Sequence, residues 1–259
     1  MKAAICVSGQ PRFFKKGLKQ IKQFIIDHNP DIDFDFFLHA WHAKDNYDAS
    51  NWASSQIEPP PENYIDDLKK LYNPKSLMVE DQIEFTLPRA YDRAHTKEHI
   101  PYSMFYSVMQ SSNLKSAYEK NYNFKYDWVF RIRYDFNLET YINLKSLDSD
   151  KVYLPDNIQV ATPKIVSAND MFAFSNSDNM DIYGDTYNQI DKLYLNHPNM
   201  DYIQEDIIGH QLYYNKVKIA PCAFNCGLHR LNNTHWIRPL LPHNNFNPET
   251  DINGILQSI

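Results

Sequence analysis

The segment YDWVFRIRYDF, residues 126–136, is predicted to start as a β-strand because aromatic and β-branched residues favour an extended backbone. Successive side chains of a strand point to opposite faces, which places Trp128, Phe130 and Ile132 together on one face. That face is wholly apolar and is therefore expected to lie on the core of the protein. The other elements of the chain can be placed outward from this strand.

Arg131 and Arg133 fall on the opposite face, and Asp135 joins them if the extended run continues for one more pair. Charged groups at the end of an apolar strand are costly to bury unless something binds them. A diphosphate on the arginines and Mn²⁺ or Mg²⁺ on the aspartate would satisfy all three, since guanidinium suits phosphate and carboxylate oxygen suits hard cations. An Arg–Asp salt-bridge cluster without a ligand would account for the same residues.

Strand and helix patterns alternate along the chain up to this segment. Strands are predicted over residues 2–7, 33–38 and 76–80, and helices over about 14–26, 65–71 and 102–121. The order β-α-β-α-β-α-β is typical of a mostly parallel sheet with helices on its faces. We therefore predict an α/β fold of the Rossmann-like type.

The second half of the chain is more varied. Strands are predicted over residues 151–154, 171–174 and 217–220. One helix is predicted to start at the N-cap Ser177 and to carry Met180 through Tyr194 on one face, and another follows residues 200–206. No repeat or low-complexity linker interrupts the chain, so residues 1–259 are predicted to form a single domain.

Composition excludes several classes of function. The net charge of −6 and the isoelectric point near 5.9 argue against nucleic acid as a partner. No apolar run reaches the roughly 18 residues of a transmembrane helix, and the N-terminal segment is too short and polar for a signal peptide. The motifs G-x-G-x-x-G, G-x-x-x-x-G-K-[ST], H-E-x-x-H and G-x-S-x-G are missing, which disfavours dinucleotide-binding folds, P-loop NTPases, metalloproteases and α/β-hydrolases.

The cysteines favour a reducing compartment. Three cysteines in 259 residues do not form a disulfide framework, so a cytoplasmic location is expected. Cys222, Cys226, His229 and His235 follow the spacing C-x3-C-x2-H-x5-H, which is not one of the usual zinc arrangements. Ordinary buried thiols are therefore predicted in preference to a structural zinc site.

The first predicted strand leads into the loop Ser8-Gly9-Gln10-Pro11-Arg12. Ligands of parallel α/β sheets bind at the carboxyl ends of the strands, which makes this loop a candidate binding site in which Arg12 could reach a phosphate. A tight surface turn with a solvated arginine is the alternative.

The second predicted strand ends in His39-Ala40-Trp41. A histidine and a tryptophan at a strand end could line the same site. A single histidine is, however, more often a hydrogen-bonded structural residue.

These segments together resemble the GT-A type of nucleotide-sugar-dependent glycosyltransferase, and within it the small bacterial and large-DNA-virus members related to the WavE lipopolysaccharide-synthesis proteins. The resemblance depends on the order and spacing of five short segments. They are Ile5-Cys6-Val7-Ser8-Gly9-Gln10-Pro11-Arg12, Phe36-Phe37-Leu38-His39-Ala40-Trp41, Phe130-Arg131-Ile132-Arg133-Tyr134-Asp135, Asn169-Asp170-Met171-Phe172-Ala173-Phe174 and Gln204-Glu205-Asp206.

The resemblance implies a nucleotide site and a metal site. It assigns nucleotide binding to Ser8, Gly9, Gln10 and Arg12, and Arg131, Arg133 and His39 are expected beside them. The Asp-x-Asp metal motif of the family is replaced by Arg133-Tyr134-Asp135, which leaves Asp135 as the expected ligand of Mn²⁺ or Mg²⁺. A histidine near the C-terminus completes the metal shell in some members, and the candidates are His229, His235 and His243.

The resemblance also implies a catalytic base in the segment Gln204-Glu205-Asp206. An acceptor hydroxyl must lose a proton as it attacks the anomeric carbon of the sugar, and a positioned carboxylate can accept that proton. Asp206 is the preferred base, while Glu205 and Asp170 are the expected acceptor-binding carboxylates. Acidic residues that only complement the dipole of a helix N-terminus would show the same pattern.

The expected function is therefore transfer of a sugar from a UDP- or GDP-linked donor to a glycan acceptor, with inversion. Residues 1–136 would form the nucleotide-binding half and residues 137–259 the acceptor-binding half. Two alternatives stay open from the sequence. One is a sugar-nucleotidyltransferase, which shares the strand–loop–helix opening, and the other is a non-catalytic carbohydrate-binding or scaffold protein with a degenerate site.

Overall fold

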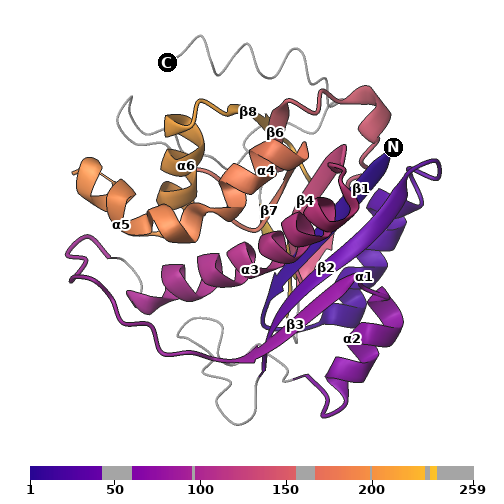
Figure 1. The fold of residues 1–259 in the computed structure, drawn as a ribbon, viewed down its shortest axis with the longest axis horizontal. Helices are drawn as coiled ribbons and strands as arrows, with labels where there is room; N and C mark the ends of the chain where they lie inside the picture. The colour runs from indigo at the N-terminus through magenta and orange to yellow at the C-terminus, as the bar shows by residue number, and fades with distance from the viewer. Residues whose placement is uncertain (43–59, 95–96, 156–166, 199, 231–233, 238–259) are drawn as a thin grey trace.

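The computed structural model describes residues 1–42, 60–94, 97–155, 167–198, 200–230 and 234–237. Its centre is a seven-stranded sheet with the strand order β3-β2-β1-β4-β7-β6-β8 (Figure 1). The strands are β1 (Lys2–Gly9), β2 (Asp33–His42), β3 (Ser76–Asp81), β4 (Trp128–Arg133), β6 (Lys151–Pro155), β7 (Phe172–Ser175) and β8 (Lys218–Cys222). Only β7 among them runs antiparallel to its neighbours, so the predicted α/β fold with a mostly parallel sheet is confirmed.

Helices cover both faces of this sheet. One face carries α1 (Phe14–Ile21), its π-helical extension η1 (Lys22–Ile26) and α2 (Tyr64–Tyr72), and the other carries α3 (His99–Tyr122), α4 (Ser177–Gly184), α5 (Thr186–Asn196) and α6 (Gln204–Tyr214) (Figure 1). A 3-10 turn, η3 (Leu144–Ser146), precedes β6. A small second sheet has the order β10-β9-β5, with β5 (Phe136–Leu138), β9 (Cys226–His229) and β10 (Thr234–Ile237).

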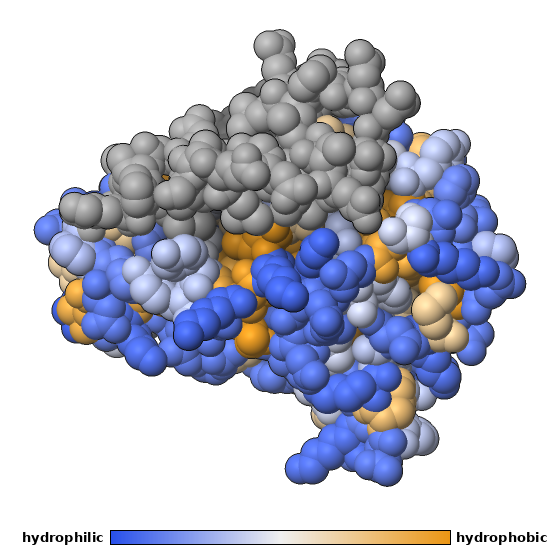
Figure 2. Space-filling view, turned by 90° about the horizontal axis from the view of Figure 1, so that it is seen from above, coloured by the Kyte–Doolittle hydropathy of each residue, from blue (hydrophilic) through white to orange (hydrophobic). Residues whose placement is uncertain are grey.

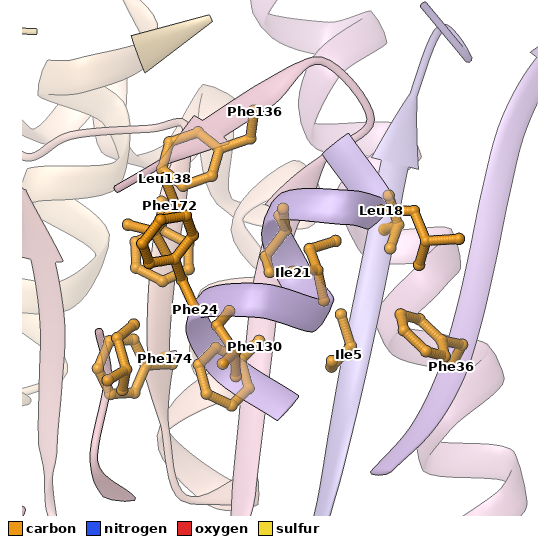
Figure 3. Packing of buried hydrophobic residues seen from close by; sticks show 14 of the residues in the cluster. Ile5, Leu18, Ile21, Phe24, Phe36, Phe130, Phe136, Leu138, Phe172 and Phe174 are labelled. Atoms are coloured by element: carbon orange, nitrogen blue, oxygen red, sulfur yellow. The ribbon is translucent and has the colours of Figure 1, made fainter. Parts of the chain in front are cut away.

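The alternation of β4 separates two hydrophobic cores. Trp128, Phe130 and Ile132 lie in the core beneath α1 and α2, as predicted, and aromatic residues of β5 and β7 complete it (Figure 3). Val129 lies in the second core, beneath α3, α4 and α6. Arg131 and Arg133 share that second face, so the predicted separation of apolar and charged side chains is confirmed.

The chain reverses its direction of travel across the sheet after β3. It adds β2 and β3 on one side of β1 and then returns to place β4 on the other side of β1. The carboxyl ends of β1 and β4 therefore lie at a topological switch point, which is where open α/β sheets bind ligands. In this molecule these two ends carry the segments Ser8-Gly9 and Arg131-Ile132-Arg133.

Two predicted elements were wrong in their bounds. The single helix predicted from Ser177 to Tyr194 is two helices that meet at Asp185, and its N-cap is Asn176, whose side-chain oxygen accepts a hydrogen bond from the Asn179 N–H at 2.9 Å. Gly184 is the last residue of α4 and allows α4 to approach α3 closely, since a Cβ there would lie 2.4 Å from Ser112 Oγ.

The extended run of β4 also ends earlier than residue 136. It stops at Arg133, a turn follows, and Phe136 begins β5 by pairing with Leu228 of β9. Asp135 therefore sits in the turn between the two sheets rather than on a continuing strand. The charged face that the sequence indicates is assembled by this turn.

The predicted burial of the cysteines is confirmed. Cys6, Cys222 and Cys226 are buried, and the last two lie in the core beneath α1 and α2. The His235 side chain and His243 lie outside the described residues. None of the helices in the described part of the chain combines the length and apolarity needed to span a bilayer.

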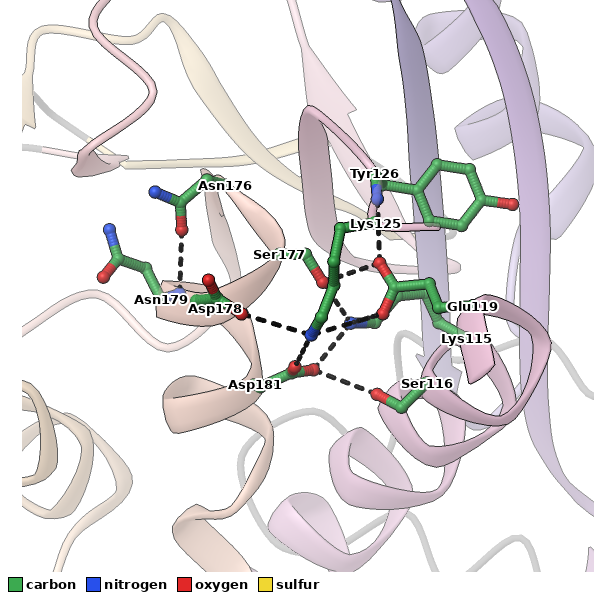
Figure 4. A network of polar contacts seen from close by, with 10 residues as sticks. All are labelled: Lys115, Ser116, Glu119, Lys125, Tyr126, Asn176, Ser177, Asp178, Asn179 and Asp181. Atoms are coloured by element: carbon green, nitrogen blue, oxygen red, sulfur yellow. Dashed lines mark hydrogen bonds and ion pairs between the residues drawn. The ribbon is translucent and has the colours of Figure 1, made fainter. Parts of the chain in front are cut away.

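A polar network fastens α3 to α4 on the second face (Figure 4). The ammonium group of Lys115, which is fully buried, donates to Glu119, Ser177 and Asp181 over 2.6–3.0 Å. Glu119 also accepts the backbone N–H of Tyr126, just before β4. The network thus connects two helices to the start of the central strand.

Replacing Gly17 by alanine is expected to destabilise the protein by about 1–3 kcal/mol, the usual range for overpacking. Gly17 faces the turn after β4, and an added Cβ would lie 2.1 Å from the carbonyl oxygen of Tyr134. Chemical denaturation gives the free energy of unfolding. Lys19→Ala, an exposed change in the same helix, should stay within about 0.5 kcal/mol of the unmodified protein. An equal effect of the two changes would contradict the close approach of α1 to this turn.

Candidate functional site

A cavity of about 770 Å³ opens at the carboxyl ends of β1, β2 and β4. Its polar end is formed by residues from the two strands at the switch point and the segments that follow them. Its other walls come from β2 and from the connection between β3 and α3. The lining residues are Ser8, Gly9, Gln10, Arg12, Trp41, Gln82, Ile83, Glu84, Phe85, Leu87, Glu98, His99, Ile100, Ser103, Met104, Arg131, Arg133 and Asp135.

Strand register brings the predicted nucleotide-binding residues together. Ser8 is paired with Arg133 of β4 on one side and with His39 of β2 on the other. Cys6, two residues before Ser8, is paired with Arg131, so Ser8 and both arginines occupy one face of the sheet. Gly9 follows with a φ of 113°, a conformation that favours glycine and turns the chain away from the sheet.

Arg131 is a deeply buried charge in the lining of this cavity. The residue is 2% exposed, and burial lowers the pKa of its guanidinium group. Its Nε and Nη1 atoms have no hydrogen-bond partner among the described residues, and the same holds for the buried Oγ of Ser8. Buried donors are normally hydrogen-bonded, so these groups mark a place where a bound ligand would complete the bonding.

Asp135 is held between two arginines. It accepts hydrogen bonds from Nε and Nη2 of Arg133 at 2.8 and 3.0 Å, and from Nη1 of Arg230 at 3.0 Å. Burial alone would raise the pKa of Asp135, but the two guanidinium groups outweigh it and lower the pKa to about 2. The contact of Arg230 with Asp135 was not predicted from the sequence. Arg230 reaches this turn from the end of β9.

The donor set does not fit the expected metal ion. Both carboxylate oxygens of Asp135 are used by guanidinium groups, and within the described ranges no three His, Cys, Asp or Glu side chains come together as a metal site would require. His229 is almost buried, with its ring near Phe13 and the charge of Lys16. The pattern is that of an anion site, in which carboxylate supports the guanidinium groups.

Gln10 and Arg12 line the cavity from the loop after β1. The guanidinium group of Arg12 donates to the side-chain oxygen of Gln10, and the Arg12 N–H donates to the Gln10 carbonyl at 2.8 Å. Phe13 then adopts a left-handed conformation with a φ of 49° before α1 begins. The loop thus turns sharply and presents Arg12 to the same space as Arg133.

His39 lies outside the cavity lining although it sits beside Ser8 in the sheet. It is fully buried, with Nδ1 2.6 Å from Ser107 Oγ and Nε2 2.8 Å from a carboxylate oxygen of Glu80. Burial lowers its pKa against the opposing effect of Glu80. Both ring nitrogens are occupied, so the structural interpretation of this histidine is favoured over ligand binding.

Apolar and polar side chains alternate in the rest of the lining. The apolar part includes Trp41 and Phe85, which pack edge to face at 6.4 Å, together with Leu87, Ile100 and Met104. Trp41 also stacks on Tyr106 at 5.4 Å. The sequence missed Phe85 and Leu87 because they lie in an irregular segment without helical or strand periodicity. Aromatic faces of this kind accept a nucleobase or a sugar ring.

Two of the expected carboxylates, Glu205 and Asp206, lie at the start of α6, and the third, Asp170, lies in the segment before β7. The Ala168 N–H donates to the Glu205 carbonyl at 2.9 Å, which joins the segment before β7 to the helix. The charge of Asp170 raises the pKa of both Arg131 and Arg133, which places this carboxylate within electrostatic range of the cavity. Burial, followed by the charges of Asp170 and Asp206, raises the pKa of Glu205 to about 7.

Asp206 occupies a different environment from Glu205. It is 2% exposed; one carboxylate oxygen accepts the Ser167 hydroxyl and the other accepts the Asp201 N–H at 3.1 Å. Such bonds at the start of a helix are typical of a structural carboxylate. Glu205 is partly exposed and its pKa is raised to about 7, so its carboxyl group is better suited than that of Asp206 to exchange a proton near neutral pH.

No protein-family model and no curated protein sequence matches this chain. The function is therefore argued from the cavity and its charged groups.

Proposed function

We propose that this protein is a glycosyltransferase that uses a nucleoside-diphosphate sugar as donor and a glycan hydroxyl as acceptor. The proposal is supported by the cavity at the switch point, whose lining combines Arg12, Arg131 and Arg133 with a wall that contains aromatic and aliphatic side chains. A nucleoside diphosphate has the same division between an anionic diphosphate and a flat, partly apolar base. The wall would hold the base or a sugar ring, and the arginines the diphosphate.

The carboxylates at α6 support transfer rather than binding alone. Titratable groups with strongly shifted pKa values are typical of catalytic sites, and Glu205 is linked to the cavity arginines through the charge of Asp170. In the proposed reaction the Glu205 carboxylate takes the proton of the acceptor hydroxyl, whose oxygen forms a bond to the anomeric carbon. The bond from that carbon to the diphosphate oxygen breaks, and the nucleoside diphosphate leaves with the electron pair. This single displacement inverts the anomeric centre.

The arginines lower the barrier of this step. Negative charge builds up on the diphosphate as the sugar departs, and fixed cationic groups in a partly buried site stabilise that charge. Asp135 keeps Arg133 in place. Asp170 interacts electrostatically with Arg133 and also with Glu205. In the proposed reaction, a carboxylate therefore removes the proton of the acceptor, and the arginines stabilise the leaving group.

Thermal unfolding with UDP, GDP, UTP and GTP tests the proposed substrate class. A nucleoside diphosphate present at about 100 times its Kd is expected to stabilise the protein by about 2.7 kcal/mol, which appears as a rise in Tm. Uridine, which carries no phosphate, serves as the control for binding through the base and ribose alone. A rise only with the triphosphates would favour a sugar-nucleotidyltransferase, and no rise with any nucleotide would contradict the proposal.

A further inference from the structure

We propose that the diphosphate of the donor is neutralised by guanidinium groups alone, with Arg131 as its buried ligand, and that its binding requires no divalent cation. This inference rests on the proposed function and concerns the same cavity. It departs from the Mn²⁺ or Mg²⁺ that the resemblance to GT-A enzymes implies.

Arg131 is held in a fixed, buried position. Its side chain comes from the middle of the main sheet, between β1 and β7, so its position is fixed by strands on both sides. Two of its guanidinium nitrogens lack a partner within the described residues while the residue is 2% exposed. A phosphate group offers acceptor oxygens to such donors and compensates the buried charge of the guanidinium group.

The carboxylate of Asp135 is already occupied by arginines. A metal ion on this carboxylate would have to displace hydrogen bonds from Arg133 or Arg230, whose nitrogens lie 2.8–3.0 Å from its oxygens. Displacement would leave a guanidinium group beside the ion without its counter-charge, and both effects oppose metal binding. Asp135 therefore acts as the support of Arg133.

The polar end of the cavity is rich in positive charge. Arg12, Arg131 and Arg133 line it together, and Asp135 is already engaged by two arginines. Two glutamates of the lining, Glu84 and Glu98, come from the connection between β3 and α3 rather than from the switch point. At the switch point itself, three guanidinium groups outnumber one paired carboxylate, and this local positive charge favours a diphosphate over a divalent cation.

Isothermal titration of UDP and GDP into the full chain tests this inference, once with EDTA and once with Mn²⁺ or Mg²⁺. The Kd is expected to agree within about twofold between the two conditions. Arg131→Met is expected to raise the Kd in EDTA at least tenfold, in line with a charge-assisted bond. Arg131→Lys keeps the positive charge but loses the planar guanidinium group, and it is expected to weaken binding as well.

Arg89→Met is the matched control, because Arg89 lies outside the cavity lining and pairs with Asp191 at the surface. Its Kd should equal that of the unmodified protein. Binding that appears only with a metal ion would overturn the inference and leave the proposed function intact, as would unchanged binding by both Arg131 variants. A lack of binding in both conditions would instead contradict the proposed function. The comparison of EDTA with metal uses the unmodified protein and so does not depend on the folding of any variant.

Discussion

Replacing Glu205 by glutamine is expected to reduce sugar transfer about 10²- to 10⁴-fold, the usual contribution of a positioned general base. The change keeps the size of the side chain and removes only its ability to accept a proton. Nucleoside-diphosphate binding should be unchanged because Glu205 is absent from the lining of the diphosphate cavity. Release of UDP or GDP from a panel of nucleotide sugars, with and without glycan acceptors, measures the effect.

The pH dependence of transfer gives the same prediction a second readout. A general base must be ionised, and the pKa of Glu205 is raised to about 7. The rate is therefore expected to rise between about pH 6 and pH 8 and then to level off. The residual activity of Glu205→Gln should lack this rise.

Stability should change in the opposite direction with pH. Because burial and the neighbouring carboxylates raise the pKa of Glu205 in the folded protein, the fold binds its proton more tightly than the unfolded chain does. This contribution is fully present below the unfolded pKa of about 4.3 and is lost as the pH rises to about 7. Compared with the unmodified protein, Glu205→Gln should gain of the order of 2 kcal/mol at pH 8 relative to pH 4.

Three further variants, one of them a control, test which carboxylate accepts the proton. Glu139→Gln changes an exposed carboxylate after β5 and should leave transfer unchanged. Asp206→Asn should lower stability, since Asp206 bonds Ser167 and the Asp201 N–H, without a selective loss of transfer. Full activity of Glu205→Gln together with an inactive Asp170→Asn would move the base to Asp170.

The sequence was sufficient to predict the main sheet because each strand and helix carries its own local signal. Alternation in β4 separates Phe130 from Arg131, and a turn follows β1 at Gly9, so the position of the cavity at the strand ends could be expected. The alternation requires only that one face of the strand be apolar. It holds here even though the second face is also buried.

The composition of the site depended on contacts that no local pattern reveals. Arg230 reaches Asp135 across 95 residues of sequence, and this contact changes the expected metal ligand into an ion-paired carboxylate. The sequence also could not show which of Glu205 and Asp206 is the structural carboxylate. From Asp206 to Leu212 every residue of α6 is buried, so the helix has no polar face to show which carboxylate points outward.

Replacing Lys115 by methionine is expected to lower the free energy of unfolding by about 3–5 kcal/mol, which is typical of a buried ion pair that loses one partner. Methionine fills similar space but leaves Glu119, which is 3% exposed, without its buried counter-charge (Figure 4). Asp181 loses its 2.6 Å bond at the same time. Denaturation by urea, followed by circular dichroism, measures the difference.

Lys125 provides a matched control for this change because it pairs with the same Asp181. Its ammonium group lies 2.8 Å from Asp181 Oδ2, but its side chain is 54% exposed. An exposed ion pair contributes at most about 1 kcal/mol, so Lys125→Met should cost far less than Lys115→Met. Equal losses would show that Lys115 does not hold α3 against α4. A loss confined to Lys115→Met would show that burial, rather than the number of ion pairs, gives the network its weight beside the central strand.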